Sequence, residues 1–122
     1  MRQPLLAWAL LLAVTAPLAA DARDDALKLL VGKWQITRKS GEREVVGVME
    51  FTAGGKASMK VKNDRGETSF TGTFKLIDEN NVEITFTFKD VPMTDRSKLK
   101  VTKDTLELTD SRGKTQRYTR LP

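Results

Sequence analysis

The sequence predicts an all-β domain, an eight-stranded antiparallel up-and-down barrel with a short N-terminal helix. Three observations support this fold class. Eight segments alternate apolar and polar residues with a period of two, short stretches rich in Gly, Asp, Asn and Ser separate them, and the apolar phase persists from segment to segment. A two-sheet sandwich satisfies the same pattern. We favour the barrel because a meander whose last strand returns to the first leaves no exposed sheet edge.

The first 22 residues have the layout of a secretory signal peptide. Met1-Arg2-Gln3 is a basic start, residues 5–14 are apolar, and small residues then favour cleavage after Ala22, with Ala20 as the alternative. The barrel domain would then span residues 23–122. The apolar run is shorter than the roughly 20 residues that cross a bilayer, so we expect no transmembrane anchor. Without a cysteine to accept a lipid, the expected location is secreted or periplasmic.

The composition indicates one domain without obvious catalytic equipment. The chain has 122 residues, of which 39% are hydrophobic, and it contains neither cysteine nor histidine. The fold must therefore rely on packing, and the commonest general base and metal ligand is missing. The sequence also has no phosphate-binding loop and no nucleophile turn. We expect no enzyme, no catalytic residue, no cofactor and no metal ion.

A helix is expected directly after the signal peptide. Asp24 and Asp25 precede apolar residues Ala26, Leu27 and Leu30, which predicts one or two helical turns that begin with favourable negative charge. The strands are expected at residues 33–39, 45–52, 56–63, 68–77, 81–89, 97–102, 105–110 and 115–121. Their connections are short, and the longest spans residues 90–96. Neighbouring strands should therefore pair antiparallel.

The period of two assigns one face of every strand to the interior. The apolar members of this inward phase are Trp34, Ile36, Met49, Phe51, Ala57, Met59, Val61, Phe70, Phe74, Leu76, Val82, Ile84, Phe86, Phe88, Leu99, Val101, Leu106, Leu108 and Tyr118, and Gly72 shares it. The opposite phase is largely Lys, Thr, Glu and Ser.

Two elements of the sequence carry a resemblance to a known family. Gly32-Lys33-Trp34 begins the first strand, and Arg120 lies on the last. This combination resembles the lipocalins, and in particular the small bacterial secreted lipocalin-like domains with a calycin-type barrel. The resemblance implies that Gly32, Trp34 and Arg120 form a barrel-closing motif. A guanidinium over the indole face would contribute about 0.5 to 2 kcal/mol, and Gly32 would allow a sharp bend from helix into strand.

The opposite end of the barrel is the expected binding mouth. Its inward-phase residues are Arg38, Asn63, Phe70, Phe88, Asp110 and Gln116, with Tyr118 one step deeper, and Met93 lies in the apolar patch Val91-Pro92-Met93 of the 90–96 connection, which we interpret as a lid. Apolar walls with a few polar groups are typical of a small-molecule site. We therefore expect a small hydrophobic molecule or lipid, with Arg38 or Arg43 available to an anionic head group. The alternative is an interior filled by its own side chains.

Two further functions remain open from the sequence. The barrel could act as a protein-interaction or inhibitor module in the cell envelope, through Val91-Pro92-Met93 or the segment 45–48. The net charge of +5 also permits adhesion to an anionic polymer, through residues such as Lys60 and Lys98. Export argues against nucleic acid as the partner.

Overall fold

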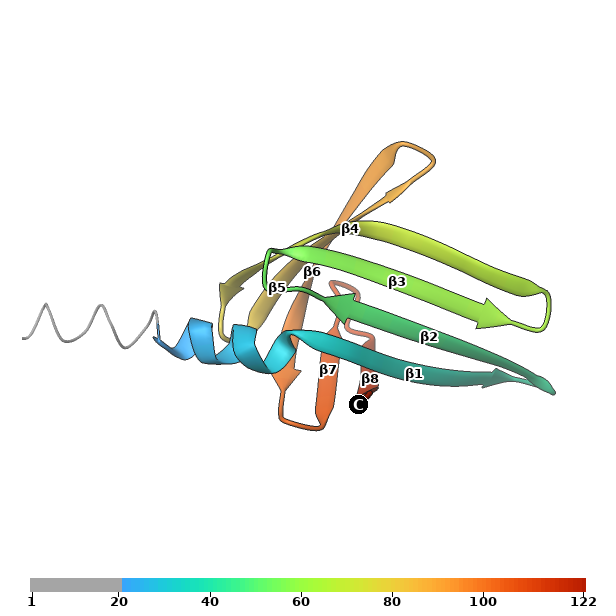
Figure 1. Cartoon of the computed structure of the whole chain (residues 1–122), viewed down its shortest axis with the longest axis horizontal. Helices are drawn as coiled ribbons and strands as arrows, with labels where there is room; N and C mark the ends of the chain where they lie inside the picture. The colour runs from blue at the N-terminus through green and yellow to red at the C-terminus, as the bar shows by residue number, and fades with distance from the viewer. Residues whose placement is uncertain (1–20) are drawn as a thin grey trace, which may run out of the picture.

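The computed structural model describes residues 21–122, so all but the last two residues of the predicted signal peptide lie outside the described part of the chain. Residues 21–30 are helical, which is longer than the predicted one or two turns. Ala26 and Leu30 of this helix are buried in the core of the barrel. The helix therefore anchors one end of the barrel, as Figure 1 shows.

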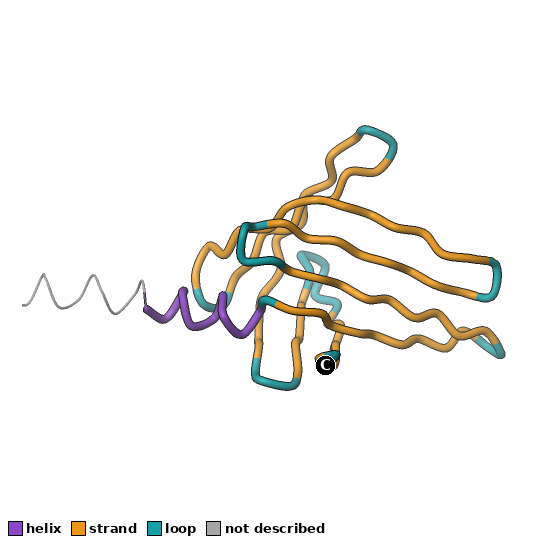
Figure 2. Tube along the Cα trace, viewed as in Figure 1, coloured by secondary structure: helices purple, strands orange, loops and turns teal. Residues whose placement is uncertain are grey.

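Eight strands follow the helix and close into a barrel in sequence order, each antiparallel to its neighbours (Figures 1 and 2). Their bounds are β1 Gly32–Ser40, β2 Arg43–Phe51, β3 Lys56–Asn63, β4 Gly66–Asp78, β5 Asn81–Phe88, β6 Val91–Val101, β7 Thr105–Thr109 and β8 Thr115–Arg120. The predicted fold class is confirmed. The alternating burial along β2 and β7 follows the predicted inward phase.

The predicted lid loop at residues 90–96 was wrong, because β6 already begins at Val91. Lys89 and Asp90 form a two-residue turn, and both have positive φ, 50° and 66°. This is the backbone conformation that matches the twist of a tight hairpin. Val91 then pairs with Phe88. The mouth is therefore bordered by paired strands and not by a mobile flap.

Pro92 fits this strand because of its place in the hairpin. Phe88 and Val91 flank the two-residue turn, and residues in this position form both backbone hydrogen bonds with each other. The backbone groups of the next residue, Pro92, therefore point away from β5, toward the other edge of β6. At Pro92 that edge is free, since pairing between β6 and β7 begins only at Lys98 and Thr109. A proline is tolerated on such an edge because no backbone donor is required there.

The barrel wall is uneven in height. β1 pairs with β8 only at Trp34 with Arg120 and at Gln35 with Thr119. The outer parts of β1–β4 and of the β5–β6 hairpin project beyond the short β7–β8 hairpin, as Figure 1 shows. The interior is accordingly enclosed at the helix end and exposed at the opposite end.

The enclosed end is filled by large apolar side chains. Trp34, Phe51 and Tyr118 are at most 1% exposed. The rings of Phe51 and Phe74 meet edge to face with centroids 4.9 Å apart. The predicted alternative of a filled interior therefore describes this end of the barrel.

The predicted barrel-closing motif is present at the helix end. The Arg120 guanidinium lies 4.1 Å from the centroid of the Trp34 ring. Arg120 also donates hydrogen bonds to the carbonyl oxygens of Lys103 (2.6 Å), Val31 (3.1 Å) and Leu29. Trp34 Nε1 donates to the Leu30 carbonyl oxygen at 2.9 Å. The motif thus fastens the first strand, the last strand and the helix together.

Gly32 is required at this point for two reasons. Its φ of 139° is a conformation that residues with a side chain rarely adopt. A Cβ atom at this position would also lie 2.6 Å from Arg120 Nη1. The bend was predicted, and the close approach of the guanidinium was not.

No helix in the described residues is long and apolar enough to cross a membrane.

A candidate ligand pocket at the open end

A pocket of about 670 Å³ lies at the open end, between the strands β4–β6 and the turn that joins β7 to β8. This volume is within the range of small-molecule sites, about 300 to 1,000 Å³. The lining residues are Phe70, Ile84, Phe86, Phe88, Met93, Thr94, Asp95, Ser97, Asp110, Ser111 and Arg112.

One wall of the pocket is aromatic. Alternation along β5 brings Phe86 and Phe88 to the inner face, and Phe70 of β4 lies beside Phe88 with ring centroids 5.7 Å apart. Met93 joins them because it pairs with Phe86 across the hairpin. Phe88 is 46% exposed and Met93 64% exposed, since the short β7–β8 hairpin leaves the hairpin tip uncovered. This wall offers apolar surface that the protein itself does not bury.

The facing wall is polar and comes from β6 and the β7–β8 turn. The Ser111 hydroxyl donates to Asp95 Oδ1 at 3.2 Å, which links the turn to β6. Asp110 Oδ1 accepts hydrogen bonds from the backbone N–H groups of Arg112 and Lys114, both at 2.9 Å. These bonds hold both carboxylates beside the pocket.

Ser97 is the buried polar residue of the pocket wall. Its side chain is inward on β6, opposite the fully buried Val82. Ser97 is only 7% exposed, yet it makes no side-chain hydrogen bond within residues 21–122. No fully buried side-chain nitrogen or oxygen in these residues lacks a partner, so the Ser97 hydroxyl is open to the pocket, where a ligand can reach it.

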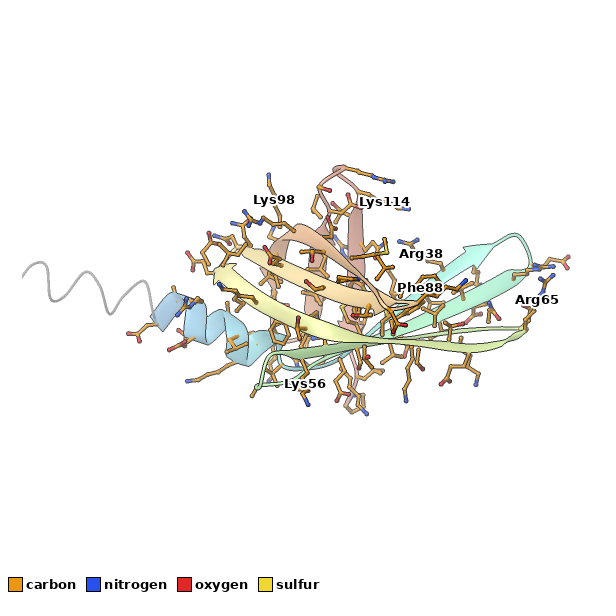
Figure 3. The ribbon with its side chains drawn as sticks, turned by 90° about the horizontal axis from the view of Figure 1, so that it is seen from above. Arg38, Lys56, Arg65, Phe88, Lys98 and Lys114 are labelled. Atoms are coloured by element: carbon orange, nitrogen blue, oxygen red, sulfur yellow. The ribbon has the colours of Figure 1, made fainter. Side chains whose placement is uncertain are left out.

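The predicted site residues separate into two groups. Phe70, Phe88 and Met93 line the pocket, as does Asp110. Asn63 does not line it: its side chain accepts a hydrogen bond from the backbone N–H of Arg65 in the β3–β4 turn. Figure 3 shows Arg65 at the outer tip of this hairpin, well away from Phe88.

Arg38, Gln116 and Tyr118 form a separate cluster that does not line the pocket. The Tyr118 hydroxyl donates to Gln116 Oε1 at 2.8 Å. Burial raises the pKa of Tyr118, and the nearby positive charge of Arg38 opposes this shift. Arg43, the other arginine expected to meet an anionic head group, forms an ion pair of 3.9 Å with Asp64 instead.

Of the polar side of the pocket, only Asp110 was predicted from the sequence. Asp95 and Ser97 were assigned to a loop or a strand start, although Val91, Met93, Asp95, Ser97 and Leu99 share one phase with period two. That alternation is the signal that could have extended the strand across Pro92. Phe86 was placed inward but not at the mouth, because the height of the wall was unknown.

Other features of the structure are weaker candidates. A smaller hollow of about 380 Å³ lies between β5, β6 and β7 and is lined by Asn81, Lys98 and Glu107 among others. These residues belong to the solvated outer phase. Among residues 21–122, no three acidic, His or Cys side chains gather in a way that would hold a metal ion.

Comparison with known proteins agrees with the architecture. A family model described as a lipocalin-like domain matches residues 30–119. A search of curated proteins finds no match. Among solved structures, a de novo designed β-barrel from the design of a fluorescence-activating barrel aligns with a TM-score of 0.50 and 18% identity, covering 80% of this chain and 98% of that one. At this level of identity the likeness concerns the fold alone.

Proposed function

Because the chain belongs to the lipocalin-like domain family, we propose that it binds a small apolar or amphipathic molecule in the pocket at its open end. The observation that carries the proposal is the aromatic wall. Phe88 and Met93 remain about half exposed or more beside a hollow of about 670 Å³. Covering this surface with a ligand would remove apolar area from water, at about 25 cal/mol per Å².

We further propose that the protein works outside the cytoplasm, in the periplasm or as a secreted protein. The support is the signal-like layout of residues 1–22 and the lack of a lipid-acceptor cysteine. A ligand-binding barrel in this compartment would carry or sequester poorly soluble molecules.

A neutral amphiphile tests the binding proposal. Decanol at 100 times its dissociation constant should add about 2.7 kcal/mol to the free energy of unfolding and raise the melting temperature. The variant Phe88→Ser should bind decanol about fivefold more weakly, because it removes part of a contact worth about 1.5 to 3 kcal/mol when fully buried. Thermal unfolding and calorimetric titration measure both effects.

The matched control is Ile77→Ser. Ile77 is also a large exposed apolar side chain, 37% exposed, but it does not line the pocket. Its variant should bind decanol as the unmodified protein does. Equal affinities for Phe88→Ser and Ile77→Ser would reject the proposal, as would no binding either of decanol or of its charged analogues decylamine and decanoate.

A second candidate function is docking of an envelope protein at the β5–β6 tip. Val91 favours it, because this side chain is 60% exposed and does not line the pocket. The variant Val91→Ser distinguishes the two functions. It should leave decanol binding unchanged and weaken only a protein contact at the tip.

A further inference from the structure

We propose that the natural ligand of the pocket is a cation, an amine carried on an apolar body. This inference rests on the proposed function, since it names the charge of the molecule that the same pocket takes. It reverses the expectation of an anionic head group, because neither Arg38 nor Arg43 lines the pocket.

The charged side chains that line the pocket are Asp95, Asp110 and Arg112. The ion pairs found within residues 21–122 join Arg43 to Asp64, Arg96 to Glu83 and Arg117 to Glu107. Neither pocket carboxylate takes part in them. Arg96 follows Asp95 in the sequence, but alternation places it on the outer face, where it meets Glu83. The pocket therefore has a local excess of negative charge in a protein whose net charge is +5.

Both carboxylates keep an oxygen available. Asp110 uses Oδ1 for the backbone of its own turn, and Asp95 uses Oδ1 for Ser111. In the described residues, Oδ2 of either side chain accepts no hydrogen bond from another side chain or turn. A carboxylate acts only as an acceptor, and an ammonium group carries only donors. The free oxygens thus match a cationic group and repel an anionic one.

Ser97 adds an observation that is independent of the acidic residues. Its hydroxyl is on a side chain more than nine-tenths buried, faces the pocket, and has no side-chain partner among residues 21–122. Within residues 21–122 no fully buried side-chain nitrogen or oxygen lacks a partner, so the Ser97 hydroxyl oxygen is accessible from the pocket. A ligand that covers this hydroxyl must replace its hydrogen bonds to water, which favours a ligand with a donor at this point. A primary ammonium group has three N–H donors. If each of the two carboxylates accepts one of them, the Ser97 hydroxyl oxygen can accept the third.

The aromatic wall also suits a cation on an apolar body. The Lys89 ammonium already lies over the Phe88 ring, 5.6 Å from its centroid. Aromatic faces attract cations in this way. The same rings provide apolar contact area for the rest of the ligand.

The test compares three ligands of equal chain length, decylamine, decanol and decanoate, by calorimetric titration at neutral pH. We expect decylamine to bind roughly tenfold more tightly than decanol, which is the strength of one hydrogen bond to a charged group. Decanoate should bind most weakly. Because the net charge of +5 attracts anions to the protein as a whole, a preference for the amine must come from the pocket.

Conservative variants locate the effect. Asp95→Asn and Asp110→Asn keep an acceptor for Ser111 and for the turn, and each should reduce the preference for decylamine over decanol. Arg112→Gln should strengthen decylamine binding, since it removes the one positive charge among the lining residues. The control is Asp90→Asn at the hairpin tip, where asparagine tolerates the φ of 66° and where the side chain does not line the pocket.

The outcomes separate the two proposals. If decanol binds but decylamine gains nothing over it, or if the gain survives in both Asp95→Asn and Asp110→Asn, the cationic ligand is rejected and the binding function stands. Tighter binding of decanoate would also reject it. If none of the three molecules binds, both proposals fail.

Discussion

Arg120 shows how one side chain secures the closed end of the barrel. Its guanidinium contacts the Trp34 ring and three carbonyl oxygens, which belong to the helix end, to the residue between the helix and β1, and to the β6–β7 turn. The pairing of Trp34 with Arg120 was predictable, because a meander returns its last strand to its first. The contact of Arg120 with Gly32 was not, since a pattern of residues does not show how closely a side chain approaches the backbone.

Replacement of Arg120 by lysine should be costly even though the charge is kept. A lysine cannot bind three carbonyl oxygens in a plane while it covers the indole, so Arg120→Lys should lower the free energy of unfolding by about 2 to 4 kcal/mol. Urea unfolding followed by circular dichroism measures the loss. Arg117→Lys, at an exposed ion pair with Glu107, should cost under about 1 kcal/mol. Equal losses for the two variants would contradict the role of Arg120.

At the scale of elements, the β5–β6 hairpin determines the site. The sequence patterns located all eight strands but predicted too late a start for β6. A proline is not typical of a strand, and Lys89-Asp90 is not a typical sequence for a tight turn. The alternation through Met93, Asp95 and Ser97 outweighs the proline once the edge is known to be free. The edge of β6 is free because β7 is short. The bounds of β7 were predicted nearly correctly, but its effect on the edge of β6 was not recognised from the sequence.

Gly72 allows the backbone of β4 to lie very close to that of β5. A Cβ atom at Gly72 would lie 1.8 Å from the Thr85 carbonyl oxygen, which is part of the paired backbone of β5. Gly72→Ala should therefore lower the free energy of unfolding by about 1 to 3 kcal/mol, as overpacked cores do. Gly54→Ala is the matched control, since a Cβ there meets nothing within 4 Å, and it should change stability by less than about 0.5 kcal/mol. Urea midpoints of the two variants should differ accordingly, and coincident midpoints would refute the need for glycine at this close approach.

At the scale of the whole molecule, unequal strand lengths divide the barrel into a filled part and an open part. An eight-stranded barrel is just wide enough for its own side chains to fill it, and Trp34, Phe51 and Tyr118 do so near the helix. Beyond Lys98 and Thr109 the wall of β7 and β8 stops, while β5 and β6 continue. Period-two patterns predict which residues face inward, but not where the wall ends. For this reason the sequence predicted Phe70, Phe88, Met93 and Asp110 of the site but not Phe86, Asp95 or Ser97.

The most direct test of the central claim is to locate a bound amphiphile by titrating the isotope-labelled protein with decanol and following the backbone amide signals by NMR. If the amphiphile binds in the pocket, the signals should shift in a saturable way, most strongly at Phe86, Met93 and Ser97 and little at Trp34 and Leu106 in the filled end. Shifts confined to outer-face residues such as Lys60, or no saturable shift at all, would contradict it.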